Sequence, residues 1–518
     1  MVKDKEKIFI RGVNWVGDAV MTIPAIRSLR IALRDAEISQ LLRPTVASIF
    51  DKHPDINNLL IYEESYKGIT GKINLINMLK SKSFSKAFLF QNAFDAAMLA
   101  FLAGIPERIG YNRDGRGFML TNPVEFNGED RKIHHIEYYL TLLRRAGIKA
   151  EYSIPYIFQS HEERSEARER LSKLKRPIIG INPGATYGSA KRWIPQRFAE
   201  IIIKVISNLD GSVVIFGGKN EEATAMEIER FTANMSEKLS EDEQHSRLLN
   251  LAGKTTLREL INLISECDAL ITNDSGPMHI SYAVGTPLVA IFGSTSPALT
   301  GPPEEGNVVI RSNIECSPCF KRICPLNNIK CMEGITVDEV YHGLEKVIPR
   351  KKVVFFDRDG TLCKEVDYLS RWEDFTVFPE IESLTKLIEK GYYLIGVSNQ
   401  SGIGRGYVDE KFVQEVNSLF IDSYLMDDFF YCPHHPADNC SCRKPQLSLL
   451  YKARAKYNID FKSSYVVGDK DTDMLLAKAA GAKGILVKTG KQIESPYSTY
   501  TANNLADAVD YILRTDCK

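Results

Sequence analysis

The chain has 518 residues, of which 44% are hydrophobic, and its 66 basic residues are matched by 66 acidic ones. This composition is enough for two or three large cores and excludes a disordered or fibrous chain. Zero net charge argues against general nucleic-acid binding, which requires a basic field. No apolar stretch approaches the roughly 18 residues of a membrane-spanning helix, and the charged start Met1–Lys7 does not resemble a secretory signal.

The first predicted strand runs from Lys7 to Val13, and the residues Asn14–Asp18 turn into a helix that we expect to begin near Ala19. Asp18 would lie at the amino terminus of this helix, where the helix dipole stabilises a carboxylate. Simple N-capping accounts for an aspartate at such a position, and from the residues alone this is the preferred interpretation.

Three later strands also end in polar loops. The strand 177–182 leads into the small-residue loop 183–193, whose two cations, Lys191 and Arg192, suit close approach to a phosphate. A strand over 211–218 precedes Glu221 and Glu222, and the strand 269–272 precedes the segment 273–279, a helix and the strand 288–292. Alternating strands and helices predict parallel sheets covered by helices on both faces. About 345 residues exceed one core, so two lobes facing each other across a cleft are expected.

Three segments in this order, Asn14–Asp18, Lys191–Trp193 and Asp274–His279, resemble the lipopolysaccharide heptosyltransferases over essentially residues 7–347. The resemblance implies a two-lobed GT-B glycosyltransferase over 1–347, with an N-lobe of about 1–160 and a C-lobe of about 175–347. It also implies transfer of heptose from ADP-heptose to a lipid-linked core oligosaccharide, without a metal. Asp18 would then be the general base instead of a cap.

The same resemblance implies the donor-binding residues. Lys191, Thr186 and the amides of Asp274, Ser275 and Gly276 would contact the diphosphate and heptose. Either Glu221 or Glu222 would hold the ribose hydroxyls. His279 would either touch the diphosphate or satisfy backbone groups.

Four further cysteines lie near the end of this part, in the order Cys316, Cys319, Cys324 and Cys331. Their spacing is compatible with a structural metal, and reduced free or packed thiols are the preferred alternative. Ten cysteines, seven of them in two ligand-like clusters, fit a reducing cytoplasm better than a disulfide framework. The segment 347–352 is a short polar joint to the rest of the chain.

After this joint, the apolar run 352–356 leads into Asp357-Arg358-Asp359-Gly360-Thr361. Side chains at i and i+2 of an extended chain point to one side, so Asp357 and Asp359 can address one reacting centre. A second strand ends in 397–402, with hydroxyl and amide groups at Ser398 and Asn399. Positive charge follows at Arg443 and Lys444. A third strand, 465–467, ends in a segment that contains Asp469, Lys470 and Asp473.

These strand ends resemble the four motifs of the haloacid dehalogenase-type (HAD-like) phosphatases, over residues 351–518. The resemblance implies an α/β fold in which Asp357 is the nucleophile and Asp359 the general acid and base. Magnesium would be bound by Asp357, the Asp359 carbonyl and Asp469. It also implies phosphoryl-binding or supporting residues, namely Ser398, Asn399, Arg443, Lys444 and Lys470. Asp473 is preferred as a cap for a helix beginning near Met474.

The loop 432–442 carries Cys432, His434, Cys440 and Cys442, a ligand set that suits structural, tetrahedral zinc. His435 is the alternative imidazole ligand. With the segment 399–406, this loop resembles two kinds of phosphatase, acting on D-glycero-D-manno-heptose 1,7-bisphosphate at the 7-phosphate or on histidinol phosphate.

The resemblance of residues 7–347 to heptosyltransferases favours the heptose bisphosphate over histidinol phosphate as the substrate of the phosphatase. We therefore predict a cytoplasmic bifunctional enzyme of lipopolysaccharide heptose metabolism, with peripheral contact at the inner membrane where a lipid-linked acceptor would lie. The alternatives are a glycosyltransferase fused to a histidinol-phosphate or other small-molecule phosphatase, and a chain in which one half is a non-catalytic scaffold.

Overall fold

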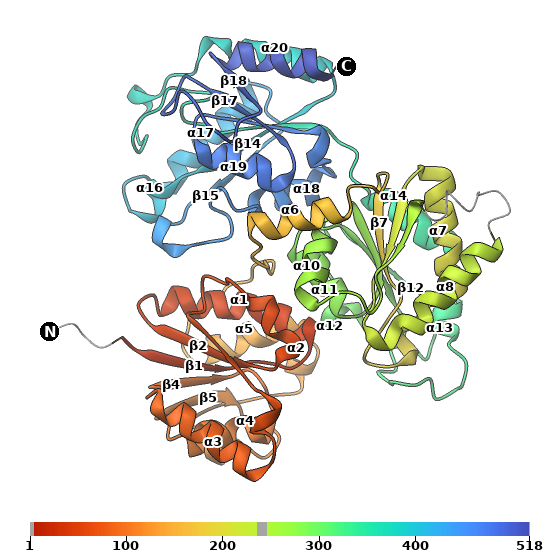
Figure 1. Cartoon of the computed structure of the whole chain (residues 1–518). Helices are drawn as coiled ribbons and strands as arrows, with labels where there is room; N and C mark the ends of the chain where they lie inside the picture. The colour runs from red at the N-terminus through yellow and green to blue at the C-terminus, as the bar shows by residue number, and fades with distance from the viewer. Residues whose placement is uncertain (1–4, 236–245, 517–518) are drawn as a thin grey trace. The chain divides into compact units, whose positions relative to one another are not determined.

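The computed structural model describes residues 5–235 and 246–516. The chain divides into two compact units, Met1–Ile348 and Pro349–Lys518. The described residues form three six-stranded parallel sheets, of which two belong to the first unit and one to the second (Figure 1). The predicted α/β class with parallel sheets is confirmed.

The first sheet has the strand order β3-β2-β1-β4-β5-β6. Its strands are β1 (Lys7–Arg11), β2 (Glu37–Leu42), β3 (Asn58–Ile61), β4 (Lys86–Leu89), β5 (Glu107–Tyr111) and β6 (Asn122–Val124). The helices of this region are α1 (Val16–Ala32), α2 (Pro44–Ala47), α3 (Gly68–Ser81), α4 (Phe94–Leu102) and α5 (His135–Arg145).

The second sheet repeats this topology with the order β12-β11-β10-β7-β8-β9. Its strands are β7 (Ile178–Asn182), β8 (Ser212–Ile215), β9 (Leu248–Asn250), β10 (Ala269–Asn273), β11 (Leu288–Phe292) and β12 (Val308–Arg311). Its helices are α6 (His161–Arg170), α7 (Pro195–Leu209), α8 (Glu222–Met235), α10 (Leu257–Glu266), α11 (Gly276–Ala283), α12 (Pro297–Thr300), α13 (Lys330–Glu333) and α14 (Val337–Val347).

The third sheet, in the second unit, has the order β15-β14-β13-β16-β17-β18. Its strands are β13 (Val353–Phe356), β14 (Tyr393–Asn399), β15 (Asp428–Cys432), β16 (Tyr465–Gly468), β17 (Lys483–Val487) and β18 (Tyr500–Ala502). The helices of this unit are α15 (Thr385–Glu389), α16 (Ser401–Gly404), α17 (Glu410–Ser423), α18 (Ser448–Tyr457), α19 (Asp471–Ala480) and α20 (Leu505–Asp516).

In each sheet, successive strands are added first on one side of the first strand and then on the other. This reversal lies between β1 and β4 in the first sheet, β7 and β10 in the second, and β13 and β16 in the third. The central strands beside these points are buried on both faces, as in β13, whose four residues are all fully buried. Ligands of open parallel sheets bind beyond the carboxyl ends of such strands. Asp18 follows β1, Asp274 follows β10 and Asp357 follows β13, so the topology places each at a reversal point.

Helix α1 begins at Val16, earlier than the predicted start near Ala19, so Asp18 lies inside its first turn. The N-cap residue is Trp15, which makes no side-chain capping bond. The expected N-cap role of Asp18 is therefore wrong. At this start, Val16 packs against Gly276 of α11, where an added Cβ would lie 2.9 Å from the Val16 side chain.

Helix α19 likewise begins at Asp471 and not near Met474. Asp473 still caps the helix from within the first turn, because its Oδ2 accepts a hydrogen bond from the Lys470 backbone N–H at 3.2 Å. Its other oxygen is paired with a lysine of the site described below.

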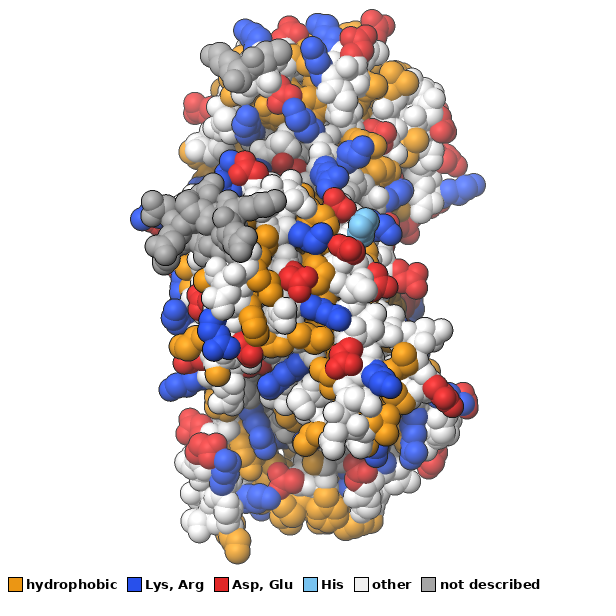
Figure 2. Space-filling model, turned by 90° about the vertical axis from the view of Figure 1, so that its right-hand side faces the viewer, with side chains coloured by type: hydrophobic (Ala, Val, Ile, Leu, Met, Phe, Trp, Pro, Cys, Tyr) orange, Lys and Arg blue, Asp and Glu red, His pale blue; other side chains and the backbone are white. Residues whose placement is uncertain are grey.

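None of the helices in the described part of the chain combines the length and the apolar composition that crossing a bilayer requires. Figure 2 shows one face of the molecule, on which acidic and basic side chains are interspersed. Neither sign of charge is gathered on that face, which agrees with the equal numbers of basic and acidic residues, 66 of each.

Candidate functional sites

Asp357 is the first residue after β13 and is buried beside two lysines. Lys444 Nζ lies 2.9 Å from Asp357 Oδ1 and 2.6 Å from Asp473 Oδ1. Lys470 Nζ lies 4.0 Å from Asp357 Oδ2 and 3.2 Å from Asp469 Oδ1. Three carboxylates and two ammonium groups from separate strand ends therefore converge at one reversal point of the third sheet.

The charges set the ionisation of the carboxylates. Burial raises the pKa of Asp357, but the positive charges of Lys444 and Lys470 outweigh burial, so this pKa lies below its ordinary value. Burial and the charge of Asp357 raise the pKa of Asp469. Asp357 is therefore ionised at neutral pH, as a carboxylate nucleophile must be. The raised pKa of Asp469 indicates negative charge that the surrounding residues do not fully balance.

The carboxylate of Asp359 is held by two residues that the sequence did not single out. Arg358 Nε and Nη2 lie 3.0 and 3.1 Å from the two oxygens of Asp359. Gln400 Nε2 donates to Asp359 Oδ2 at 2.9 Å and to Ser398 Oγ at 2.7 Å. Strand alternation predicts that Arg358 points away from Asp359. The chain has already left β13 at this point, which lets the guanidinium turn back.

A cavity of about 250 Å³ opens beside these side chains. Its lining includes the predicted residues Asp357, Asp359, Ser398, Asn399, Arg443, Lys444 and Lys470. Nη1 of Arg443 is buried and makes no hydrogen bond to a described residue, so it is available to a ligand. Asn399, by contrast, accepts from the Lys444 N–H at 2.9 Å and donates to the Lys444 carbonyl at 3.3 Å. Its side chain therefore orders the segment that carries Lys444.

The carboxylates fit a divalent cation. Oxygen atoms of Asp357, Asp469 and Asp473 lie within 4.8 Å of one another. Oδ1 of Asp469 is buried and, apart from its ion pair with Lys470 at 3.2 Å, makes no hydrogen bond to a described residue. Carboxylate oxygens are the ligands that magnesium prefers. Lys444 is paired with Oδ1 of Asp473 and with Oδ1 of Asp357, so Oδ2 of Asp357 and the carboxylate of Asp469 are the oxygens that suit a cation.

Gly360 allows the turn after Asp359. Its φ is +84°, and an added Cβ would lie 2.6 Å from Asp469 Oδ2. Gly391 has a similar φ of +78°, but an added Cβ there would meet nothing within 4 Å. We expect Gly360→Ala to lower the free energy of unfolding of the second unit by about 1 to 3 kcal/mol. Gly391→Ala should cost less, because only backbone strain is added.

Urea titration of the full-length protein, followed by the loss of secondary structure in circular dichroism, measures both values. Equal midpoints for the two alanine variants would contradict the contact between residue 360 and Asp469.

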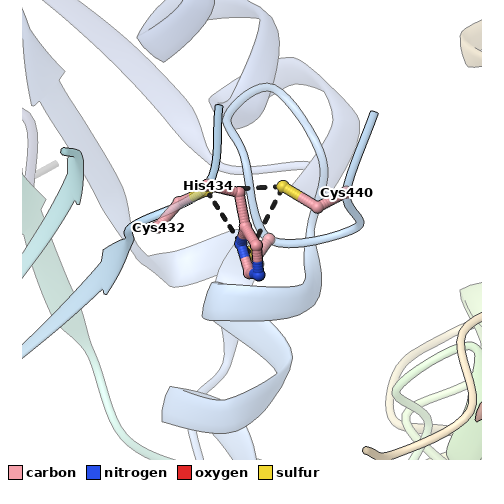
Figure 3. Close-up of side chains that lie close together, drawn as sticks. Cys432, His434 and Cys440 are labelled. Atoms are coloured by element: carbon pink, nitrogen blue, oxygen red, sulfur yellow. Dashed lines mark hydrogen bonds between the residues drawn. The ribbon is translucent and has the colours of Figure 1, made fainter. Parts of the chain in front are cut away.

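Four potential zinc ligands converge in the loop after β15. Cys432 Sγ lies 3.4 Å from Cys440 Sγ and 3.6 Å from His434 Nδ1. In Figure 3 the His434 ring points toward the sulfurs of Cys432 and Cys440. His434 Nδ1 lies 3.1 Å from Cys442 Sγ, which is 3.5 Å from Cys440 Sγ. All four ligand atoms lie within 4.8 Å of one another.

This geometry fits one tetrahedral zinc ion, whose bonds to sulfur are about 2.3 Å long. His435, the alternative ligand, is used elsewhere, because its Nδ1 accepts a hydrogen bond from the Ala437 N–H at 3.1 Å. Four protein ligands would leave zinc no open position, so such an ion would be structural.

In the first unit, the loop after β7 meets the end of β10. Lys191 Nζ lies 2.5 Å from Asp274 Oδ2, and Thr295 Oγ1 donates to the same oxygen at 2.6 Å. Ser275 is the N-cap residue of α11, and its Oγ lies 3.2 Å from Asn182 Nδ2. The structure thus brings together Lys191, Asp274 and Ser275, which the sequence placed in one site. Thr295 was missed, because nothing in its local sequence distinguishes it from an ordinary loop threonine.

The amino-terminal turns of α1 and α11 pack directly against each other. An added Cβ on Gly17 would lie 2.7 Å from the His279 ring, so the contact depends on glycine. Two positive helix ends lie side by side as a result, which favours an anion at this place. Asp18, in the first turn of α1, has its Oδ1 3.5 Å from His135 Nδ1, and its side chain is 30% exposed.

His279 does not offer a positive charge. Burial lowers the pKa of its imidazole to about 4, despite the opposing charges of Asp274 and Asp18. Its Nδ1 lies 3.0 Å from the Tyr282 hydroxyl. The imidazole is therefore neutral at physiological pH and packs against Gly17.

The remaining predicted donor residues lie on neighbouring loops of the second sheet. Glu221 Oε2 accepts from the Gly218 N–H at 2.8 Å, and its carboxylate lies against Gly184 in the loop that carries Lys191. Glu222 lies against Gly253, beyond β9. Thr186 is exposed on the Lys191 loop. The two glutamates thus face different loops.

Comparisons with known proteins cover both units. The family model for glycosyltransferase family 9 (heptosyltransferase) matches residues 73–330, and a HAD-hydrolase-like model matches residues 441–512. The chain is 31% identical over 315 residues to lipopolysaccharide heptosyltransferase 2 of Escherichia coli K12, covering 59% of this chain and 88% of that protein. The solved structure of E. coli ADP-heptose lps heptosyltransferase II aligns with a TM-score of 0.57 and 28% identity, over 66% of this chain and 98% of that one.

The second unit has its own relatives. The chain is 40% identical over 179 residues to D-glycero-beta-D-manno-heptose-1,7-bisphosphate 7-phosphatase of Haemophilus ducreyi, covering 31% of this chain and 98% of that protein.

The two units define an enzyme of two classes, a two-lobed GT-B glycosyltransferase followed by a phosphatase. The chain belongs to the glycosyltransferase family 9 heptosyltransferases through its first unit and to the HAD-like phosphatases through its second. The expectation of a bifunctional glycosyltransferase and phosphatase is confirmed.

Proposed function

We propose that residues 351–518 of the second unit hydrolyse the 7-phosphate of D-glycero-D-manno-heptose 1,7-bisphosphate. The observation that carries this proposal is the buried, ionised Asp357 held between Lys444 and Lys470 at the edge of a 250 Å³ cavity. The 40% identity to a phosphatase with this substrate in its name supports the choice of sugar.

The reaction proceeds in two steps. Asp357 attacks phosphorus, the bond from phosphorus to the sugar oxygen breaks, and Asp359 donates its proton to that oxygen. Water then attacks the aspartyl phosphate, Asp359 accepts a proton from the water, and the bond between phosphorus and Asp357 breaks. Arg443, Lys444 and Ser398 bind phosphoryl oxygens, and Lys470 holds the acidic group together.

Two metals belong to this proposal. Asp357, Asp469 and the carbonyl of Asp359 would hold magnesium, which neutralises the crowded negative charge when bound. Zinc on the loop 432–442 would fix the chain segment that leads into Arg443 and Lys444. That loop connects β15 to the cavity wall, which gives the zinc a structural part in substrate binding.

For residues 1–347, in the first unit, we propose transfer of a heptosyl group from ADP-heptose to a sugar hydroxyl. Asp18 takes the proton of the accepting hydroxyl, whose oxygen then bonds to the heptose anomeric carbon while ADP leaves. The contact between the first turns of α1 and α11 supports this, since it places Asp18 beside a pair of helix amino termini suited to the diphosphate.

Several residues hold the donor in this proposal. Lys191, Thr186 and the backbone amides of Asp274, Ser275 and Gly276 contact the diphosphate and heptose. Glu221 and Glu222 are the candidates for the ribose hydroxyls. His279, being neutral, supports the Gly17 turn instead of binding charge.

The acceptor follows from the same chemistry. A lipid-linked core oligosaccharide would be met at the inner leaflet, so we propose a cytoplasmic enzyme with peripheral membrane contact. Flotation of the purified protein with vesicles that carry the core lipid tests this location. Protein that stays with the soluble fraction in the presence of those vesicles would contradict it.

Phosphate release with magnesium tests the substrate of the second unit. Both anomers of heptose 1,7-bisphosphate and histidinol phosphate are compared, with Asp357→Asn as the blank. We expect a heptose anomer to be preferred by at least about 100-fold in kcat/KM, since a site built to hydrogen-bond sugar hydroxyls rejects analogues that lack them. Preference for histidinol phosphate would support the alternative phosphatase.

A further inference from the structure

A second cysteine group lies in the first unit, apart from the residues discussed above. Residues 312–329 connect β12 to α13 without helix or strand, and they carry Cys316, Cys319 and Cys324. Cys331 follows in α13. One small cavity, of about 30 Å³, has all four cysteines in its wall. Each of the four is free of a disulfide.

The loop 312–329 has little apolar packing to hold it. Three of its large hydrophobic side chains, Phe320, Ile323 and Leu326, are 47%, 71% and 59% exposed. A long segment without regular structure or a buried core requires another constraint to keep one conformation, and metal ligation supplies it in many small protein elements.

The loop nevertheless makes defined contacts with the donor-site loop. Tyr187 Oη donates to the Phe320 carbonyl at 3.0 Å, and the Ala190 N–H donates to the Arg322 carbonyl at 3.1 Å. Tyr187 and Ala190 flank the chain next to Lys191, whose ammonium lies 4.7 Å from the centre of the Tyr187 ring. The position of Lys191 thus depends on the conformation of the cysteine loop.

We propose that Cys316, Cys319, Cys324 and Cys331 form a four-thiolate site for a soft metal, zinc or iron, that clamps the segment 312–331 against the Lys191 loop. The sequence pattern, two residues between the first pair and four and six between the others, is of the kind that surrounds thiolate-bound metals. On binding, each thiol releases a proton to solvent and its sulfur bonds to the metal.

The spacing of the sulfurs distinguishes this site from the one in the second unit. Within the described residues, the ligand atoms of Cys432, His434, Cys440 and Cys442 lie within 4.8 Å of one another. The sulfurs of Cys316, Cys319, Cys324 and Cys331 do not form such a close group. A single zinc ion would therefore draw the loop inward, whereas an iron–sulfur cluster would accept the wider spacing. Both share thiolate coordination, and the metal content decides between them.

Metal analysis of the purified full-length protein tests the proposal. Wild type is compared with Cys316→Ser/Cys319→Ser, with Cys440→Ser/Cys442→Ser, and with Cys267→Ala as a control that removes a buried thiol outside both groups. We expect two occupied sites in wild type and in the control, and one in each double variant. Zinc alone indicates a single ion, and iron with acid-labile sulfide indicates a cluster. A wild-type protein whose metal is lost entirely in Cys440→Ser/Cys442→Ser would overturn the proposal.

Alkylation of the native wild-type protein provides an answer even if a double variant fails to fold. Cys316 is exposed, so without metal it should react as fast as a free thiol. With metal bound, we expect its modification to be at least about tenfold slower until a chelator is added. Immediate modification, unchanged by chelator, would contradict a metal at this site.

A third readout tests the clamp itself. The Cys316→Ser/Cys319→Ser enzyme should show a KM for the nucleotide sugar raised about 10-fold or more, with unchanged phosphatase activity, because Lys191 loses its support. This readout rests on the proposed transferase function, whereas metal content and alkylation do not, so failure of one can be told from failure of the other.

Discussion

Replacing Asp357 by asparagine should lower phosphate release at least about 10,000-fold while leaving glycosyl transfer unchanged. The amide keeps the volume of the side chain but cannot form the bond to phosphorus. Asp357 is the carboxylate whose ionised form is stabilised by Lys444 and Lys470, and the other members of the acidic group are positioned around it. Phosphate release with magnesium, measured on the full-length protein, gives the value.

Asp374→Asn is the matched control. This substitution removes one negative charge from the same unit, as Asp357→Asn does. Asp374, however, is paired with Arg371 at the surface, and its side chain is 39% exposed. Its activity should stay within about twofold of wild type, since surface substitutions away from such sites have small effects. Substantial phosphate release by Asp357→Asn would contradict covalent catalysis by this residue, and loss of both activities would indicate misfolding.

For the first unit, Asp18→Asn should lower heptosyl transfer by about 100- to 10,000-fold through kcat, with little change in the KM for the nucleotide sugar. The asparagine keeps the first turn of α1 but removes the proton acceptor. Release of ADP in the presence of ADP-heptose and a core acceptor measures the rate.

Asp338→Asn is the control that separates loss of a general base from loss of a favourable charge at a helix amino terminus. Asp338 lies in the first turn of α14, with its side chain 73% exposed and paired with Lys204. It shares with Asp18 the stabilising position at a helix amino terminus, worth about 0.3 to 1 kcal/mol. Transfer by Asp18→Asn at the rate of Asp338→Asn would show that Asp18 only stabilises its helix, as the N-capping interpretation suggested.

The site residues at the strand ends were predictable because the local sequence shows where each buried strand stops. A central strand of a parallel sheet is buried on both faces, so it appears as an apolar run such as 353–356, and the polar residue that follows marks the ligand edge. Asp357, Asp469 and Asp274 were located in this way. The potential zinc site in the loop 432–442 was also predictable, since its four candidate ligands lie within eleven residues. They converge in the structure.

The partners of those residues were not predictable, because they come from distant parts of the chain. Gln400 reaches Asp359 across 41 positions, and Thr295 reaches Asp274 across 21. The first residue of α1, Val16, packs against Gly276, which is more than 250 residues away in the sequence. Single-sequence patterns carry the propensity of a segment, and they do not contain the shape of the surface that the segment packs against.

The joint between the units is short: α14 ends at Val347 and β13 begins at Val353. Each unit has hydrophobic clusters of its own, so each contributes a complete fold to one polypeptide. Every ribosome that finishes the chain therefore delivers one glycosyltransferase and one phosphatase. Gene expression can change the amount of both but not their ratio, so the balance of flux through the two reactions is set by the turnover numbers and substrate supply of each unit.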